Sequence, residues 1–395
     1  MRLTSRVRVL AATLVAPLVL FAAGCAASPP GAADPAAPVK IGWLSTLSGV
    51  YQAPGTDMRD GFQLYLDLHG GKLGGRTIDL IVADEGDGPA TARPAAERLV
   101  KQQKVTVLAG VLNAASFLAV NELTNQAKIP LVGSNARPTR LKDVTWVWTT
   151  SWLNQHAGQA IAPYIKAHVD GPVWAIGPDN QGGYDQVGGF VDKFVSLGGR
   201  LANSSGKPTW TPFPNTTNFL PYLTQIAASE AKAVYAFFAG ANAIDFVKQY
   251  RQSDAKNLPL YGAYLTEGTV LNAQAEAAEG ILNVLNYSPD LDNPANRSFV
   301  AAWSARHDRT PTVFAADSYD AAAVLDRALA SIAGQVTPSA INEAIGKLGQ
   351  IDSPRGSWQF NATTHTPIQR WYLRKVARDG SKWSNDVVED LATLS

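Results

Sequence analysis

The chain has 395 residues, a length that suits two domains better than a single core. Its 34 basic and 33 acidic residues leave a formal net charge of +1, and charged residues make up only 17% of the chain. Because so balanced a chain has no strong field to attract a polyanion, its composition argues against nucleic acid as a partner.

The N-terminus has the organisation of an export signal. Arg2, Arg6 and Arg8 form a basic start, and residues 9–23 are apolar and rich in Ala, Leu and Val. This stretch is short for a membrane-spanning helix, and no later stretch approaches the roughly 18 uninterrupted apolar residues that such a helix needs. We therefore expect residues 1–24 to be a cleaved signal peptide, with a retained anchor as the alternative.

Cys25 is the only cysteine, so no internal disulfide bond can form. Residues 20–25 resemble the lipobox of bacterial lipoproteins, although Ala22 stands where that pattern more often has Leu, Val or Ile. The resemblance implies that Cys25 becomes the lipidated first residue and that its acyl chains hold the protein on a membrane surface. The alternative is an ordinary signal peptide with an incidental thiol. Residues 25–38 are rich in Pro and Ala, which predicts a tether.

The first folded stretch predicts a strand, a loop and a helix in that order. Residues 41–44 form an apolar run, and residues 45–55 are rich in Ser, Gly and Pro. The helix that follows carries apolar side chains at helical spacing, namely Met58, Phe62, Tyr65 and Leu66. The loop therefore leaves the carboxyl end of the strand, which is the edge where open α/β sheets bind ligands.

The same pattern continues, and small or polar residues follow two of the expected strands. Strands are expected at 78–83, 105–111 and 129–132, and helices begin near Pro89 and Asn113. The residues after the last two strands are Asn113, Ala114, Ser116, Ser134, Asn135 and Ala136. Free backbone N–H groups beside such residues suit an anion or a carboxylate. Taken singly, the Ser and Asn residues could equally be helix caps.

The pattern begins again after residue 153. Helices are expected at 154–169, at 219–228 and at 242–252, and one more is expected to end at residue 197. Strands are expected at 173–176, 234–238, 258–262 and 281–284. Three further helices are expected at 295–306, 315–332 and 339–348, followed by strands at 357–360 and 370–376. Alternating strands and helices of this kind indicate an α/β fold with a second parallel sheet.

Patterns that would indicate an enzyme are weak. The five histidines are scattered, no metal-ligand pair or G-x-S-x-G motif occurs, and residues 69–75 lack the order of a phosphate-binding loop. Ser253 and Lys256 match the S-x-x-K pattern of penicillin-recognising enzymes, but no S-D-N or K-T-G motif accompanies them. A lipid-anchored serine hydrolase using these two residues is the alternative function. We expect no catalytic residues, metal or cofactor.

Several short motifs together carry a family resemblance. The chain resembles the leucine/isoleucine/valine-binding type of ABC-transporter solute-binding protein in six places. These are residues 41–61, the strand that ends at Asp84, and residues 110–116, 129–131, 317–321 and 353–356. The resemblance covers nearly the whole chain after the tether, and it depends on the order and spacing of the motifs.

The resemblance implies the periplasmic binding protein type 1 fold, which consists of two doubly wound parallel-sheet lobes joined by three crossovers. Lobe 1 would comprise 39–153 plus 287–365, and lobe 2 would comprise 154–286 plus 366–395. The crossovers would lie near residues 153–154, 286–287 and 365–366. The ligand would bind in the cleft between the lobes, which would close over it.

The resemblance also implies a set of binding residues. A carboxylate would be held in lobe 1 near Ala114, Ser116 and Ser134 to Ala136, with Tyr51 and Asn113 beside it, and Tyr184 of lobe 2 would cover the ligand. The second aromatic of the family falls at about Ala239, among Phe237, Phe238 and Gly240. The acidic residue that pairs with an amino acid's ammonium falls near Tyr264, with Glu267 three residues later.

The presence of Tyr264 where the family has an acidic residue affects which ligand can bind. A buried ammonium without a partner costs several kcal/mol. Unless Glu267 turns inward, an aromatic or otherwise apolar carboxylate suits the site better than a branched-chain amino acid. The expected function is therefore capture of a small organic solute outside the cytoplasmic membrane and its delivery to ABC permease subunits. We expect a monomer attached to the membrane through lipidated Cys25.

Overall fold

The structure is a computed structural model, and it describes residues 37–135, 137–141, 143–380 and 382–395. The predicted signal peptide, Cys25 and most of the tether lie outside these residues. Within the described ranges, no helix is both long enough and apolar enough to cross a membrane.

The first sheet is formed by the N-terminal third of the described chain. Its strands are β1 (Val39–Ser45), β2 (Lys72–Leu73), β3 (Arg76–Asp84), β4 (Val107–Gly110), β5 (Leu131–Gly133) and β6 (Val147–Thr149). They lie in the order β2-β3-β1-β4-β5-β6, and all neighbours are parallel except β2 and β3. The carboxyl ends of the parallel strands therefore meet at one edge.

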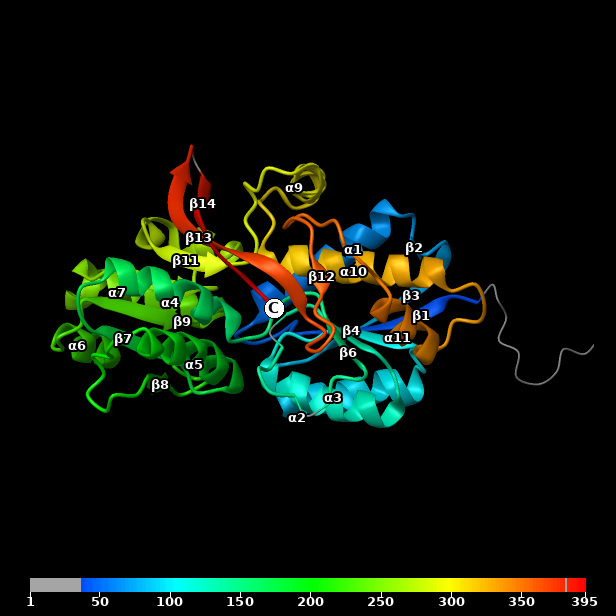
Figure 1. Cartoon of the computed structure of the whole chain (residues 1–395), viewed down its shortest axis with the longest axis horizontal. Helices are drawn as coiled ribbons and strands as arrows, with labels where there is room; N and C mark the ends of the chain where they lie inside the picture. Colours follow the sequence, from blue (N-terminus) through cyan, green and yellow to red (C-terminus); the bar gives the residue numbers. More distant parts are fainter. Residues whose placement is uncertain (1–36, 136, 142, 381) are drawn as a thin grey trace, which may run out of the picture. The chain divides into compact units, whose positions relative to one another are not determined.

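Helices cover both faces of this sheet (Figure 1). They are α1 (Gln52–Leu68), α10 (Val313–Ser331) and α11 (Pro338–Gly346) on one face, and α2 (Pro89–Glu97) and α3 (Ala114–Ala127) on the other. Alternate side chains of β1 point to opposite faces, so Trp43 packs with Phe62 of α1 while Leu44 belongs to the core that contains Phe117 of α3. Burial on both faces explains why these strands read as continuous apolar runs.

The second sheet contains eight strands from the rest of the chain. They are β7 (Val173–Pro178), β8 (Thr209–Thr211), β9 (Ala233–Phe237), β10 (Leu260–Ala263), β11 (Leu282–Leu285), β12 (Gln359–Phe360), β13 (Pro367–Asp379) and β14 (Lys382–Leu394). The order is β12-β13-β11-β10-β9-β7-β8, with β14 paired to β13. Strands β7 to β11 are parallel, and β13 joins them antiparallel through β11.

The helices of the second sheet also lie on both faces. One face carries α4 (His156–His168) and α5 (Gln181–Ser196), and the other carries α6 (Leu220–Ala227), α7 (Gly240–Gln252) and α8 (Thr269–Gln274). The remaining helix, α9 (Pro294–His307), packs through Phe299 against Tyr319 of α10. Two sheets with helices on both faces confirm the predicted α/β class, whereas the proposed lobe boundaries stay predictions.

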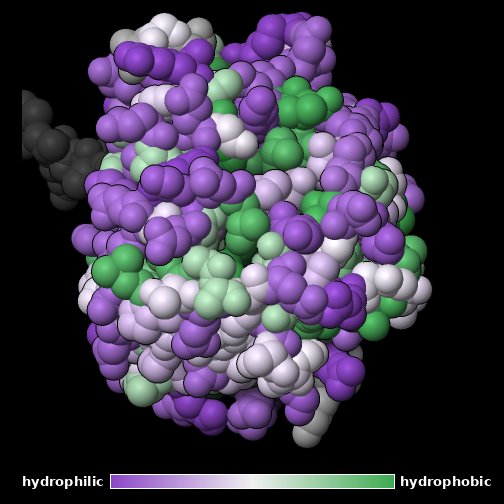
Figure 2. Space-filling model, turned by 90° about the vertical axis from the view of Figure 1, so that its left-hand side faces the viewer, coloured by the Kyte–Doolittle hydropathy of each residue, from purple (hydrophilic) through white to green (hydrophobic). Residues whose placement is uncertain are grey.

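The surface seen in Figure 2 is mainly hydrophilic, and its apolar residues form small separate groups. Among the described residues, exposed large apolar side chains such as Leu68, Val195 and Leu220 occur on different helices. Scattered side chains of this kind need no binding partner to explain them.

Candidate functional site

A cavity with about 460 Å³ of empty space lies at the carboxyl ends of the parallel strands of both sheets. Most of its lining residues lie in the loops or first helical turns that follow β1, β4, β5, β6, β7, β9 and β10. Phe237 is the last residue of β9, and Phe314 lies in the first turn of α10. The lining residues are Tyr51, Pro54, Leu112, Asn113, Ala114, Asn135, Trp152, Asn154, Asn180, Gly182, Phe237, Ala239, Tyr264 and Phe314.

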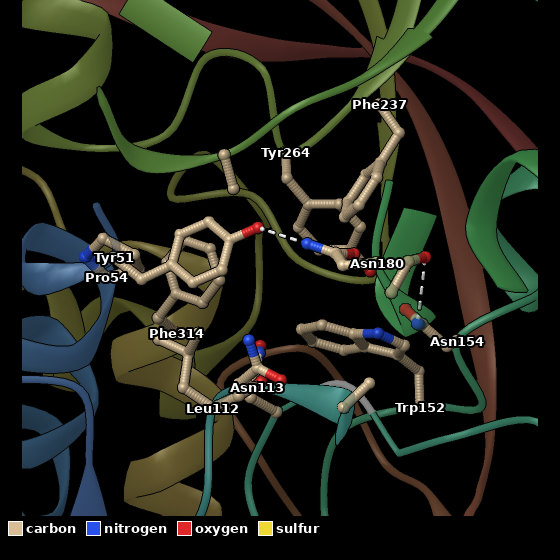
Figure 3. A pocket seen from close by; sticks show the side chains of 14 residues that line it. Tyr51, Pro54, Leu112, Asn113, Trp152, Asn154, Asn180, Phe237, Tyr264 and Phe314 are labelled. Carbon is tan, nitrogen blue, oxygen red and sulfur yellow. Dashed lines mark hydrogen bonds between the residues drawn. The ribbon is translucent and has the colours of Figure 1, made fainter. Parts of the chain in front are cut away.

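Aromatic rings form most of the walls of this cavity (Figure 3). Tyr264 lies at the centre of the group, with its ring centroid 5.1 Å from that of Trp152 and 5.6 Å from that of Phe237. The ring of Phe314 lies 6.2 Å from Tyr264 on another side. Tyr264 also has a φ of 63°, a conformation that is uncommon for a residue other than glycine and is often found at functional sites.

The polar part of the lining carries no formal charge, since it consists of asparagine, tyrosine and tryptophan side chains. Burial raises the pKa of Tyr51 to about 12 and that of Tyr264 well above its usual value. Both phenols therefore stay neutral near pH 7 and can donate a hydrogen bond. The indole Nε1 of Trp152 and the hydroxyl of Tyr264 are buried and have no hydrogen-bond partner in the described part of the chain.

Two helices begin at the cavity and direct backbone N–H groups toward it. Asn113 caps α3 and accepts from the N–H of Ala115 at 2.8 Å, while Asn180 caps α5 and accepts from the N–H of Gly183 at 2.8 Å. The N–H groups of Ala114 and Gly182 have no partner among the described residues. Helix N-termini carry partial positive charge and free donors, so this end of the cavity suits an anion.

The wall formed by Leu112 and Asn113 is held from behind by Glu85. The carboxylate of Glu85 accepts their two backbone N–H groups, each at 2.7 Å, and Glu85 itself is fully buried. Burial raises the pKa of Glu85 to about 7, although the two N–H donors act in the opposite direction. Glu85 thus positions the start of α3 without lining the cavity.

Beside the cavity, hydrogen bonds connect segments packed around the first sheet with segments packed around the second. The N–H of Ala241, at the start of α7, donates to the carbonyl of Val50 before α1 at 3.1 Å. The Nδ2 of Asn180 donates to the hydroxyl of Tyr51 at 3.4 Å, a bond drawn in Figure 3. Elsewhere the N–H of Thr139 donates to the carboxylate of Asp185 at 3.0 Å. The structure therefore has the two sides in contact around the cavity.

Five of the residues predicted from the sequence line the cavity, and they are Tyr51, Asn113, Ala114, Asn135 and Tyr264. Ser116 and Ser134 do not, because both are fully buried in the first-sheet layer, where Ser134 accepts from the hydroxyl of Ser318 at 2.9 Å. The predicted residue Ala136 lies outside the described residues.

The other four predicted residues also lie outside the cavity lining. Tyr184 is 43% exposed and packs edge-on against Trp210 at 5.0 Å, and Phe238 faces the opposite core, 5.1 Å from Phe219. Gly240 begins α7 beside Val50 and does not reach the cavity. Glu267 does not turn inward, because its carboxylate is paired with the guanidinium of Arg374 and accepts the N–H of Val313 at 3.2 Å.

The sequence patterns missed several lining residues, above all Trp152 and Phe314. At the second aromatic position they favoured Phe238 over its neighbour Phe237, which is the one that lines the cavity. Trp152 and Asn154 follow the short strand β6, which no pattern predicted, and Phe314 lies in the first turn of α10. Asn180 could have been found, because an Asn two residues after a strand end and before a helix is a typical cap.

The residues of the alternative hydrolase do not form a reactive pair. The hydroxyl of Ser253 donates to the carbonyl of Tyr250 at 2.8 Å and accepts the N–H of Ala255 at 3.2 Å, and Lys256 is exposed to solvent. Neither residue lines the cavity. Within the described part of the chain, no group of three or more His, Cys, Asp or Glu residues is placed to hold a metal ion.

Comparisons with known proteins agree on one family. Residues 38–381 match the model of the family described as "Periplasmic binding protein". The Leu/Ile/Val-binding protein homolog 6 of Brucella melitensis is 26% identical, and the alignment covers 88% of this chain and 90% of that protein.

Solved structures resemble the chain over a similar length. A solute-binding protein of an ABC transporter from R. palustris in complex with benzoate is 30% identical, with a TM-score of 0.83, and the match covers 90% of this chain and 97% of that one. Another from R. palustris, in complex with 4-hydroxybenzoate, is 25% identical with a TM-score of 0.82, and the match covers 90% of this chain and 98% of that one.

Proposed function

We propose, since the chain belongs to the periplasmic binding protein family, that it is the solute-binding component of an ABC importer and that its solute is an aromatic carboxylate. The observation that carries the choice of solute is the lining, which combines five aromatic side chains with neutral hydrogen-bond donors and no charged side chain. The complexes of similar proteins with benzoate and 4-hydroxybenzoate support the same class.

The ring of the solute would lie among Trp152, Phe237 and Tyr264, where offset and edge-on contacts between aromatic rings are favourable. Its carboxylate would be met by the N–H of Ala114, together with the Nε1 of Trp152 and the hydroxyl of Tyr264. Neutral donors are sufficient, because N–H groups at a helix start stabilise an anion.

An α-amino acid fits this lining poorly. Its ammonium would need a carboxylate or several acceptors, and the nearest candidate in sequence, Glu267, is already held by Arg374 and Val313. A buried ammonium without a partner costs several kcal/mol. A branched-chain amino acid is therefore the less favoured solute.

Binding would be coupled to closure of the two sides of the cleft. A ligand shifts the balance between open and closed forms only if it contacts both sides in the closed form. The lining meets this requirement, since Asn113 and Trp152 follow strands of the first sheet while Asn180 and Tyr264 follow strands of the second. The closed protein would then deliver the solute to the permease subunits, and a monomer attached through Cys25 would be sufficient for this.

The decisive experiment is a solute panel tested with the purified full-length chain by thermal unfolding and isothermal titration calorimetry. A bound acid should stabilise the fold by about 2.7 kcal/mol at a hundredfold excess over Kd. Benzoate and its derivatives should raise the Tm, while benzamide, leucine and valine should have little effect. A response to leucine or valine without one to any aromatic acid would refute the proposed solute class.

A further inference from the structure

Four asparagines line the cavity, and their side-chain oxygens are used in two different ways. Asn113 and Asn180 stand directly before helices, and their oxygens accept N–H groups of the first turn. Those two oxygens are therefore occupied by the protein itself.

The other two asparagines, Asn135 and Asn154, use only their NH₂ groups. The Nδ2 of Asn135 donates to the carbonyl of Leu112 at 2.8 Å, and the Nδ2 of Asn154 donates to the carbonyl of Gly182 at 3.2 Å. Because a carbonyl oxygen can only accept, these contacts determine which end of each amide is the NH₂ group.

The oxygens of these two amides are consequently left as acceptors. The Oδ1 atoms of Asn135 and Asn154 are buried, and neither has a donor among the residues that the structure describes. A buried acceptor without a donor is costly, and buried polar groups are nearly always hydrogen-bonded. Their position in the lining makes the solute the natural source of the missing donors.

A carboxylate cannot supply those donors, since an ionised carboxylate only accepts hydrogen bonds. It can satisfy the N–H of Ala114, the Nε1 of Trp152 and the hydroxyl of Tyr264, which are donors. The lining thus presents both donors and acceptors without partners, and an unsubstituted ring acid would satisfy only the donors.

Because the lining has unpaired acceptors as well as unpaired donors, we propose that the solute carries ring hydroxyl groups whose protons are accepted by the Oδ1 atoms of Asn135 and Asn154. This inference rests on the proposed function. The favoured class is a hydroxylated aromatic carboxylate rather than the unsubstituted acid. Sites built to hydrogen-bond a hydroxyl discriminate strongly against analogues that lack it, because their own polar groups then stay unpaired.

The first test compares acids on the full-length protein by isothermal titration calorimetry. The series is benzoate, 4-hydroxybenzoate, 3,4-dihydroxybenzoate and the corresponding methoxybenzoates. At least one hydroxylated acid should bind about tenfold or more tightly than benzoate, and methylation of its hydroxyl should remove the gain, because a methoxy group has no proton to donate.

The series separates the two levels of the proposal. Benzoate binding as tightly as every hydroxylated acid would overturn the hydroxyl inference and leave the aromatic-acid function standing. If no aromatic acid binds, the proposed function fails and the inference fails with it.

The second test removes the acceptors one at a time with Asn135→Leu and Asn154→Leu. The quantity measured is the ratio of the affinities for a hydroxylated acid and for benzoate, because general damage to the site weakens both acids alike. At least one of the two variants should lower this ratio at least about fivefold. The matched control is Asn272→Leu, which makes the same substitution at an exposed position of α8 outside the cavity lining and should leave the ratio unchanged.

An unaltered ratio in both leucine variants would overturn the assignment of the acceptors. If a leucine variant does not fold, the acid series on the unmodified chain still decides whether the hydroxyl is recognised.

Discussion

The carboxylate of Glu267 and the guanidinium of Arg374 form a buried ion pair beside the cavity. Arg374 also donates to the side-chain oxygen of Asn283 and, at 2.8 Å, to the carbonyl of Tyr287. Glu267 therefore stabilises the fold and does not recognise the solute. This pair removes the only acidic residue that the sequence offered for binding an ammonium group.

Replacing Glu267 by Gln should thus affect stability and leave binding nearly intact. The variant leaves Arg374 buried without its counter-charge, so we expect the free energy of unfolding to fall by about 3 kcal/mol. Affinity for an aromatic acid should change less than about threefold, because Glu267 is not among the lining residues. Urea unfolding and calorimetric titration measure the two quantities separately.

A matched control is Glu230→Gln, which breaks the exposed ion pair with Arg200 and should change stability little. A large loss of ligand affinity in Glu267→Gln, with stability unchanged, would contradict the structural role and return Glu267 to the binding site.

Closure of the cleft should depend on the absence of a side chain at Gly240. A Cβ at this position would lie 2.2 Å from the carbonyl oxygen of Val50, closer than any real contact. Gly240→Ala should therefore prevent the two sides from meeting and weaken solute binding at least about tenfold, although Gly240 does not line the cavity.

Gly240 also has a φ of +57°, so alanine there carries a backbone cost of about 1–2 kcal/mol that has nothing to do with closure. Gly280→Ala separates the two effects, because Gly280 has a φ of +76° but no atom within 4 Å of an added Cβ. Both variants should lose stability, and only Gly240→Ala should lose affinity. Equal affinities in the two variants would show that this contact has no part in closure.

The strand and helix pattern was largely predictable from the sequence, because apolar side chains recur at the spacing of the element that buries them. Met58 and Phe62 of α1 are fully buried, as the helical spacing predicts. The short strands β6 and β8 and the long hairpin strand β14 were missed. Three residues are too few to show a period, and β14 is polar and partly exposed.

The edge that carries the site was also predictable, whereas the side chains that face the cavity were harder to identify. Phe237 lines the cavity and Phe238 lies in the opposite core, yet both faces of β9 are covered by helices and are apolar. Alternation between polar and apolar residues, which reveals the orientation of a strand with one exposed face, is absent there. The role of Glu267 depends on Arg374, 107 positions away, and no local pattern reveals such a partner.

Attachment to the membrane is predicted to depend on Cys25, which lies outside the described residues. Cys25→Ser removes the only thiol and with it the site of the proposed acyl chains. Because several acyl chains are needed for stable anchoring, the variant should move from the membrane fraction to the soluble fraction of lysed cells. Ligand affinity should be unchanged. A variant that still sediments with membranes would point instead to a retained N-terminal anchor.

Stability should fall as the pH rises through the range in which Glu85 ionises in the folded protein. Burial raises the pKa of Glu85 from an ordinary value of 4.5 to about 7, so between these values the folded state binds more protons than the unfolded state. The stabilisation is then fully present below about pH 4.5 and is lost by about pH 7, with a total change of about 3 kcal/mol.

Asp57 and Asp317 have pKa values that burial raises in the same direction, so the contribution of Glu85 must be isolated by a variant. Glu85→Gln cannot ionise and should have a flatter stability curve than the unmodified chain. The difference in unfolding free energy between the two proteins, measured in urea at pH 5, 6, 7 and 8, should shift against the unmodified chain as the pH rises. A difference that stays constant over this range would mean that Glu85 is ionised throughout and that its two backbone N–H donors outweigh the effect of burial.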